Sequence, residues 1–133
     1  MELIPASHVS ENQINQFLEK NTNVAKDSLL QLGYMVQIDD QMEGCFILEA
    51  MGEGIFWLKQ LYITQAEAGK LPVLLEAILT LAKQQQAKRV YVHSHQPVVN
   101  ILLEALQFHP QKEKMFVDKY NVDKGNWWAY HVS

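Results

Sequence analysis

The sequence predicts one α/β domain, built on a mixed, mostly antiparallel sheet with a parallel β-α-β unit at its centre. Three observations lead to this prediction. Short apolar runs of strand type alternate with runs of helical period, and the run 55–63, the helical run 71–86 and the run 89–95 follow one another directly. No repeat or linker divides the 133 residues, a length that fits one domain. We therefore expect residues 1–133 to form a single domain.

The composition sets limits on compartment and partners. At 48% hydrophobic, the chain can bury a core without disulfides, and its single cysteine, Cys45, lies in the apolar run CFIL, where a buried structural thiol is expected. The formal net charge of -4 argues against a nucleic-acid partner. The N-terminus does not have the pattern of a signal peptide, and no apolar stretch reaches the roughly 18 residues of a membrane span. We expect a cytoplasmic protein with no membrane partner.

The N-terminal half predicts a strand, two helices and a hairpin. Ser10 and Gln13 form a capping box that begins the first helix, and Gly33 ends the second. Two apolar runs then flank a turn-like segment, which predicts an antiparallel hairpin. The expected elements are a strand at 2–5, a helix carrying Ile14, Phe17 and Leu18, a short helix over 24–32, strands at 34–38 and 45–51, and a turn at 39–44.

The C-terminal half contains the parallel unit. The apolar positions from Leu71 to Ala82 recur with helical spacing, and Pro72 suits the first turn of that helix. We expect the strands before and after it to be parallel, with ligands near their C-terminal ends. The remaining expected elements are a helix from Pro97 to Leu106 and strands at 115–120 and 127–133, joined by a turn at 121–126.

This order of elements resembles the GNAT superfamily of acyl-CoA-dependent N-acyltransferases over nearly the whole chain. The segment IFWLKQLYITQAEAGKLPVLLEAILTLAKQQQAKRVYVHSH matches the family's central strand, long helix and following strand, and LEALQF at 103–108 occupies the place of its Y-E-K-L-G-F motif. The resemblance implies a GNAT-like single domain with helices on both faces of the sheet. It also implies acetyl-CoA or CoA as co-substrate.

The family's cofactor loop has a pattern like R/Q-x-x-G-x-G/A, whose backbone N–H groups face the CoA pyrophosphate at a helix N-terminus. This sequence has Glu67, Lys70 and Pro72 at the three defining positions, and a register starting at Gln65 also departs from the pattern. Two interpretations remain: a divergent site that holds CoA through Lys70 and the remaining amides, or a plain strand-to-helix connection. The resemblance places cofactor contacts at Ala68, Gly69, Lys70 and Leu71.

A second departure is in the later helix. The tyrosine that often protonates the thiolate in this family matches Leu103, which has no proton to give; Gln107 replaces a glycine, and Gln96 replaces an asparagine. The backbone part of the family's site is independent of side chains. Its acyl-binding amides, in a bulged central strand, match Leu61, Tyr62 and Ile63.

The candidate general base is His93, near the end of the strand after the long helix. His95 shares its face, and Glu49 is another possible base. The alternative is that both histidines are partly exposed polar residues at a strand end. Two histidines are too few ligands for a structural zinc, so no metal site is predicted.

Trp127, Trp128 and Tyr130 form an aromatic cluster in the last expected strand. Alternation sends the two tryptophans to opposite faces, so we expect one in the core and one exposed or at an interface; a pocket wall or a homodimer interface is the alternative. Two functions follow from the resemblance. One is transfer of an acetyl or other acyl group from acyl-CoA to a primary amine of a small molecule or peptide. The other is a catalytically inactive GNAT-fold protein that binds a ligand or protein.

Overall fold

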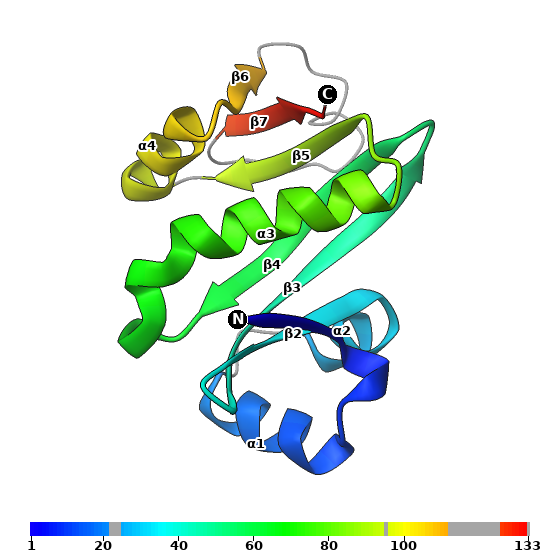
Figure 1. The fold of residues 1–133 in the computed structure, drawn as a ribbon, viewed down its shortest axis with the longest axis vertical. Helices are drawn as coiled ribbons and strands as arrows, with labels where there is room; N and C mark the ends of the chain where they lie inside the picture. The colour runs from blue at the N-terminus through cyan, green and yellow to red at the C-terminus, as the bar shows by residue number, and fades with distance from the viewer. Residues whose placement is uncertain (22–24, 95, 112–125, 133) are drawn as a thin grey trace. The chain divides into compact units, whose positions relative to one another are not determined.

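The computed structural model describes residues 1–21, 25–94, 96–111 and 126–132 (Figure 1). These residues divide into two compact units. Unit 1 contains Met1–Glu49 and Lys59–Ala77, and unit 2 contains Ala50–Leu58 and Ile78–Ser133. Three elements, β3, β4 and α3, contribute residues to both units. The single domain over residues 1–133 stays a prediction.

The sheet has seven strands in the order β1-β2-β3-β4-β5-β7-β6. Strands β4 and β5 are parallel, with Ile55–Leu58 opposite Arg89–Val92, whereas β1–β2, β2–β3, β5–β7 and β6–β7 are antiparallel. The mixed α/β sheet with a parallel β-α-β unit is therefore confirmed. The strands are β1 (Glu2–Pro5), β2 (Gly33–Ile38), β3 (Gln41–Gly52), β4 (Ile55–Ile63), β5 (Arg89–Ser94), β6 (His109–Gln111) and β7 (Asn126–His131).

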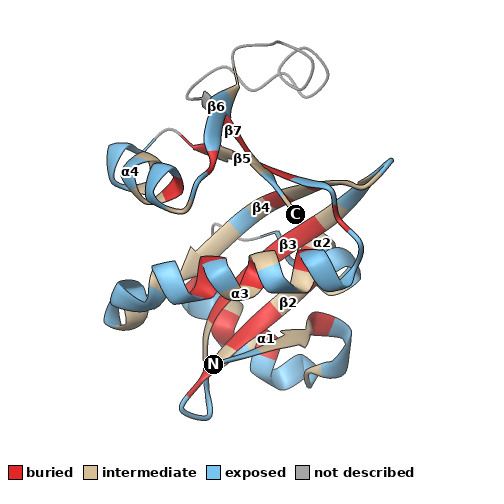
Figure 2. Cartoon of the chain, turned by 45° about the horizontal axis from the view of Figure 1, so that its top comes forward, coloured by how far each residue is buried: buried red, intermediate tan, exposed pale blue. Residues whose placement is uncertain are grey.

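In unit 1 the helices α1 (Glu11–Lys20) and α2 (Lys26–Leu32) are both present as predicted, and Val24 is outside the described residues. The serine N-cap of this prediction is confirmed, because the Ser10 hydroxyl accepts a hydrogen bond from the backbone N–H of Gln13 (3.3 Å). The Gln13 side-chain oxygen accepts a hydrogen bond from the Ser10 hydroxyl (3.1 Å). The apolar face of the helices buries Ile14, Phe17 and Leu29 against Met35 and Cys45 (Figure 2). This core holds α1 and α2 on the sheet.

The hairpin of β2 and β3 has a shorter turn than expected. Only Asp39 and Asp40 form it, both with positive φ (50° and 66°), as a two-residue hairpin turn requires. The expected turn over 39–44 is therefore wrong for its last four residues, because residues 41–44 already belong to β3. The correction moves Glu43 from a turn into a strand.

The C-terminal ends of both helices in unit 2 are followed by a residue in the left-handed backbone conformation. Helix α3 (Leu71–Gln84) is followed by Gln86 (φ 65°), and α4 (Pro97–Ala105) is followed by Gln107 (φ 70°). At the second end, the Phe108 N–H donates to the Leu103 carbonyl (2.9 Å) and the Gln107 N–H to the Glu104 carbonyl (3.0 Å). This is a Schellman motif, in which glycine is favoured at the left-handed position. Gln107 thus occupies a position whose backbone conformation favours glycine.

Both tryptophans of β7 are buried. Trp127 is 2% exposed and Trp128 is 6% exposed, so the expectation that one would be exposed is wrong. Strand β7 lies between β5 and β6 in the sheet, and both of its faces are covered. Strand β6 was not predicted because Pro110 disfavours a strand; as the last strand of the order it needs fewer ladder bonds. The predicted strand at 115–120 and residues 121–125 of the turn after it are outside the described residues, and Asn126, the last residue of that expected turn, already belongs to β7.

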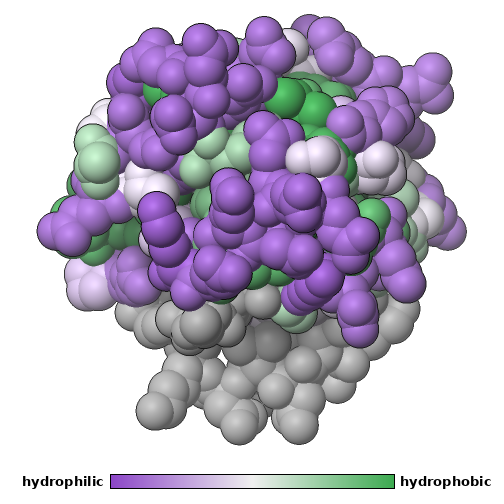
Figure 3. Space-filling model, turned by 90° about the horizontal axis from the view of Figure 1, so that it is seen from below, coloured by the Kyte–Doolittle hydropathy of each residue, from purple (hydrophilic) through white to green (hydrophobic). Residues whose placement is uncertain are grey.

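The surface drawn in Figure 3 is mostly hydrophilic, and its hydrophobic side chains are scattered among polar ones. Within the part of the chain that the structure describes, no helix has the length and apolar character needed to cross a membrane.

Cys45 is fully buried, as predicted, and burial raises the pKa of its thiol from 9.0 to about 12. The folded state therefore keeps a proton that the unfolded chain loses above its ordinary pKa. We predict that the free energy of unfolding falls as pH rises from about 9 toward 12, by up to about 1.4 kcal/mol per pH unit. Urea unfolding at stepped pH measures this slope. Cys45→Ala should unfold with a flatter pH dependence, and equal slopes would contradict the prediction.

Candidate functional site

The end of β4 contains a backbone irregularity beside the predicted acyl-binding residues. Gln60 has a positive φ of 51°, which is unusual for a residue with a side chain. Two contacts hold it: its side-chain oxygen accepts a hydrogen bond from the backbone N–H of Ala25 (3.2 Å), and the Cys45 thiol donates weakly to its carbonyl (3.9 Å). The parallel pairing of β4 with β5 covers Ile55–Leu58, before this point. Leu61, Tyr62 and Ile63 follow it, all half-buried, and stay predicted acyl-binding residues.

Glycine in β3 allows the backbone of β4 to approach closely. A β-carbon at Gly44 would lie 2.5 Å from the carbonyl oxygen of Tyr62, so no other residue fits without a shift of the strand. Next to this contact, the Thr64 N–H donates to the Glu43 carbonyl (2.8 Å). The Thr64 hydroxyl also donates to the Glu43 carboxylate (2.8 Å). The two strands therefore hold Glu43 against the end of β4.

The predicted cofactor loop is a 3₁₀ helix, η2 (Gln65–Lys70), that leads directly into α3. Ala68, Gly69 and Lys70 are exposed, and the Leu71 N–H already donates to the Ala68 carbonyl. The Lys70 ammonium forms an ion pair with Glu67 at 3.0 Å. The hydrogen bond between the Lys70 ammonium and the Glu67 carboxylate raises the pKa of Lys70, and the negative charges of Glu67, Asp39 and Glu43 raise it further. The loop cation is thus partly neutralised by its own neighbour.

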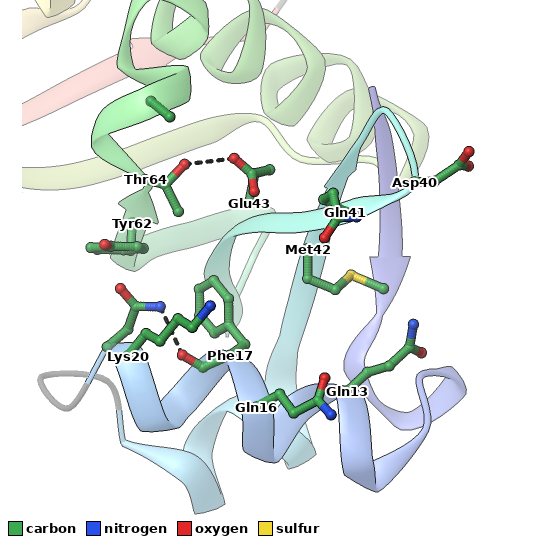
Figure 4. Close-up of a pocket in the computed structure, with 12 residues that line it drawn as sticks. Gln13, Gln16, Phe17, Lys20, Asp40, Gln41, Met42, Glu43, Tyr62 and Thr64 are labelled. Atoms are coloured by element: carbon green, nitrogen blue, oxygen red, sulfur yellow. Dashed lines mark hydrogen bonds between the residues drawn. The ribbon is translucent and has the colours of Figure 1, made fainter.

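A pocket of about 450 Å³ lies in unit 1, beside the end of β4 (Figure 4). One wall is α1, another is the β2–β3 turn with the start of β3, and a third is the end of β4. Most lining side chains are polar. The pocket is lined by Gln13, Gln16, Phe17, Lys20, Asn21, Asp40, Gln41, Met42, Glu43, Tyr62, Thr64 and Ala66.

The other sequence-predicted residues lie elsewhere. His93 is in β5 of unit 2, half-buried, with its ring 5.3 Å from that of Trp127. His95 is outside the described residues. Glu49 forms an ion pair with Lys59 at 2.7 Å, which gives it a structural partner. Leu103 is 1% exposed and belongs to the core. This burial fits its place in the Schellman motif of α4, where the corresponding residue commonly makes an apolar contact.

Leu61–Ile63 and Ala68–Leu71 both belong to unit 1, whereas His93 belongs to unit 2. Sequence reasoning missed Glu43 and Lys20. Alternation counted back from Cys45 does not place Glu43, because the register shifts at this point: Val36 pairs with Gly44 and Gln37 with Met42, so Glu43 lies at an irregularity of the strand. Sequence reasoning had also assigned Glu43 to a turn. Among the described residues, no cluster of three or more His, Cys, Asp or Glu side chains could hold a metal ion.

No protein-family model matches this sequence, and no curated protein matches it. Solved structures match its fold. The chain superposes on the N-acetyltransferase PseH of Campylobacter jejuni, solved with acetyl coenzyme A, at a TM-score of 0.70 and 12% identity, covering 99% of each chain. It matches an acetyltransferase of the GNAT family from Staphylococcus aureus at 0.63 and 12% identity, covering 95% of this chain and 82% of that one.

A third match is N-acetylglutamate synthase from Neisseria gonorrhoeae, solved with coenzyme A and N-acetyl-glutamate, at a TM-score of 0.69 and 15% identity. It covers 92% of this chain and only 32% of that larger protein. The chain therefore has the GNAT acetyltransferase fold, and the resemblance inferred from its sequence is confirmed at the level of the fold.

Proposed function

We propose that this protein transfers an acyl group, most simply acetyl, from acyl-CoA to a primary amine of a small molecule or peptide. The observation that carries the proposal is the position of Glu43. Glu43 lines a polar pocket, and its carboxylate accepts a hydrogen bond from the Thr64 hydroxyl. Thr64 is the residue directly after β4, whose end is irregular at Gln60. Structures with the same fold were solved with acetyl coenzyme A or coenzyme A.

In this proposal the acyl-CoA lies along the end of β4. The amides of Leu61, Tyr62 and Ile63 bind the acyl carbonyl and the pantetheine arm. The segment from Ala68 to Leu71, at the start of α3, receives the pyrophosphate. Lys70 is the one cation of that loop. Because Pro72 has no N–H and Lys70 is paired with Glu67, we expect CoA binding to be weaker than in a glycine-rich loop.

The pocket receives the amine, and Glu43 accepts a proton from its ammonium. The free amine attacks the thioester carbonyl carbon, a C–N bond forms, and the C–S bond breaks. The second proton leaves the new amide nitrogen and passes through solvent to the departing thiolate, since the buried Leu103 has none to give. The products are the amide and CoA thiol. His93 remains the alternative base.

Titration calorimetry with acetyl-CoA and with CoA tests the proposal. Binding at micromolar strength or tighter, together with thiol release in the presence of an amine, is the expected result. No binding at millimolar ligand would overturn it. It would favour the second candidate, a GNAT-fold protein that binds a ligand or protein without catalysis, which the Glu67–Lys70 pair, Pro72 and the buried Leu103 favour.

The acidic residue of the loop provides a specific prediction. Glu67→Gln removes a negative charge from the pyrophosphate position and frees Lys70, so we expect the Kd for CoA to fall by about two- to fivefold at low salt. Lys70→Gln should weaken binding. Glu2→Gln, an exposed residue of β1, makes the same chemical change away from the loop and should leave the Kd unchanged. Equal affinity in the wild type and Glu67→Gln would remove the loop from the CoA site.

A further inference from the structure

The charges inside the pocket are of both signs. Lys20, in the last turn of α1, carries the positive charge, and Glu43 carries the negative one. Figure 4 shows the Lys20 side chain directed toward the middle of the pocket, with Glu43 on the opposite wall. Asp40 also lines the pocket, but its carboxylate points away from the centre in the same view. The centre of the pocket thus faces one cation and one anion.

Lys20 is available to a ligand. Among the described residues, the recorded ion pairs of lysine are those of Lys26, Lys59 and Lys70. Lys20 is exposed, as a side chain at a pocket mouth must be. Its position at the C-terminus of α1 is stabilised by the helix dipole. The helix dipole explains why a cation is favourable at this end of α1. It does not explain why the Lys20 side chain is directed into the pocket.

The rest of the lining is neutral. The amides of Gln13, Gln16 and Gln41 offer donors and acceptors without net charge, and Phe17 and Met42 provide apolar surface. Asn21 is held in place, because its amide donates to the Phe17 carbonyl at 2.7 Å. A volume of about 450 Å³ exceeds the size of a single amino acid and falls in the range of small-molecule sites.

We propose that the acceptor is a small zwitterion of amino-acid type, whose ammonium faces Glu43 and whose carboxylate pairs with Lys20. This inference rests on the proposed function, because it takes the pocket as the acceptor site. A cation with two ammonium groups would bring one of them toward Lys20, which repels it. A neutral amine would leave Lys20 unpaired. The pair of opposite charges therefore selects a molecule that carries both.

The test compares matched acceptors with acetyl-CoA as donor: L-serine with ethanolamine, L-alanine with ethylamine, and the diamine cadaverine as a cationic probe. We expect kcat/KM to be higher for each amino acid than for its partner by about two- to fivefold, the effect of an ion pair at an exposed site such as Lys20. Lys20→Met should abolish this preference by raising the KM of each amino acid to that of its matched amine. Lys20→Arg should retain it.

Lys26→Met is the matched control. Lys26 is paired with Glu11 (3.8 Å), does not line the pocket, and should leave the preference intact when replaced. Equal kcat/KM for the two members of a pair, a preference for cadaverine, or an undiminished preference in Lys20→Met would each overturn the inference.

A separate measurement keeps the inference testable if no acyl transfer occurs. Binding of L-serine and of ethanolamine to the full chain, without CoA, is followed by two-dimensional NMR of the backbone amides. Shifts of pocket amides with L-serine that disappear in Lys20→Met would support the zwitterion site even where the acyltransferase proposal fails. Shifts with ethanolamine alone, or with neither compound, would reject it.

Discussion

Replacing Glu43 by Gln is expected to lower kcat by about 100- to 10,000-fold, the range for losing a general base. The amide keeps the size of the side chain but cannot take the proton of an ammonium group. The hydrogen bond from Thr64 orients the carboxylate at 2.8 Å, so the geometry should be retained in the variant. Steady-state kinetics with acetyl-CoA and a saturating amine measure the loss. The Kd for CoA should stay unchanged.

Three further variants decide whether Glu43 has this role. Glu19→Gln, an exposed residue of α1 that does not line the pocket, is the charge-matched control and should keep full activity. Thr64→Val should lower kcat by a smaller factor, because it removes the orienting hydroxyl and leaves the base. If His93→Ala abolishes turnover with CoA binding retained, while Glu43→Gln remains active, the base is His93 and the role given to Glu43 is wrong.

Trp127→Ala is expected to lower the free energy of unfolding by about 3–5 kcal/mol, the cost of removing a large aromatic side chain from a core. Trp127 is 2% exposed and is among the largest fully covered side chains. Its ring lies 5.6 Å from that of Trp57 and 5.3 Å from that of His93. The cavity left by alanine would therefore lie on the face of the sheet where the Trp127 ring packs beside those of Trp57 and His93. Urea unfolding followed by circular dichroism measures the change.

Two comparisons separate this cavity effect from a general sensitivity of unit 2. Trp127→Phe keeps part of the ring and should cost less than alanine. Ile101→Ala removes an apolar side chain that is 70% exposed on α4 and should change stability by no more than about 0.5 kcal/mol. A loss for Trp127→Ala no larger than that of Ile101→Ala would show that β7 is not part of the core.

The order of elements was predictable because each has a local cause. The capping serine of α1, the helical spacing from Leu71 to Ala82 and the aromatic run of β4 are written in neighbouring residues, and each appears as expected. The turn of the hairpin was misplaced because two aspartates in left-handed conformation reverse the chain on their own. Strand β6 was missed because Pro110 is unfavourable in a strand unless that strand lies at an edge.

The sequence by itself determined the GNAT fold, the departures of Glu67, Lys70 and Pro72 from the family's loop pattern, and the burial of Cys45. These features depend on the order of elements, on residue types at fixed spacing, and on the apolar surroundings of a thiol. The tertiary structure decided what surrounds the end of β4. It forms the ion pair between Glu67 and Lys70 and the hydrogen bond from the Thr64 hydroxyl to the Glu43 carboxylate. It also directs the Lys20 side chain into the pocket. Glu43 and Lys20 are 23 residues apart, and they share a pocket because the core between α1 and β3 brings the two segments together. Local pattern does not contain such contacts, because they form only when distant segments bury a common apolar surface.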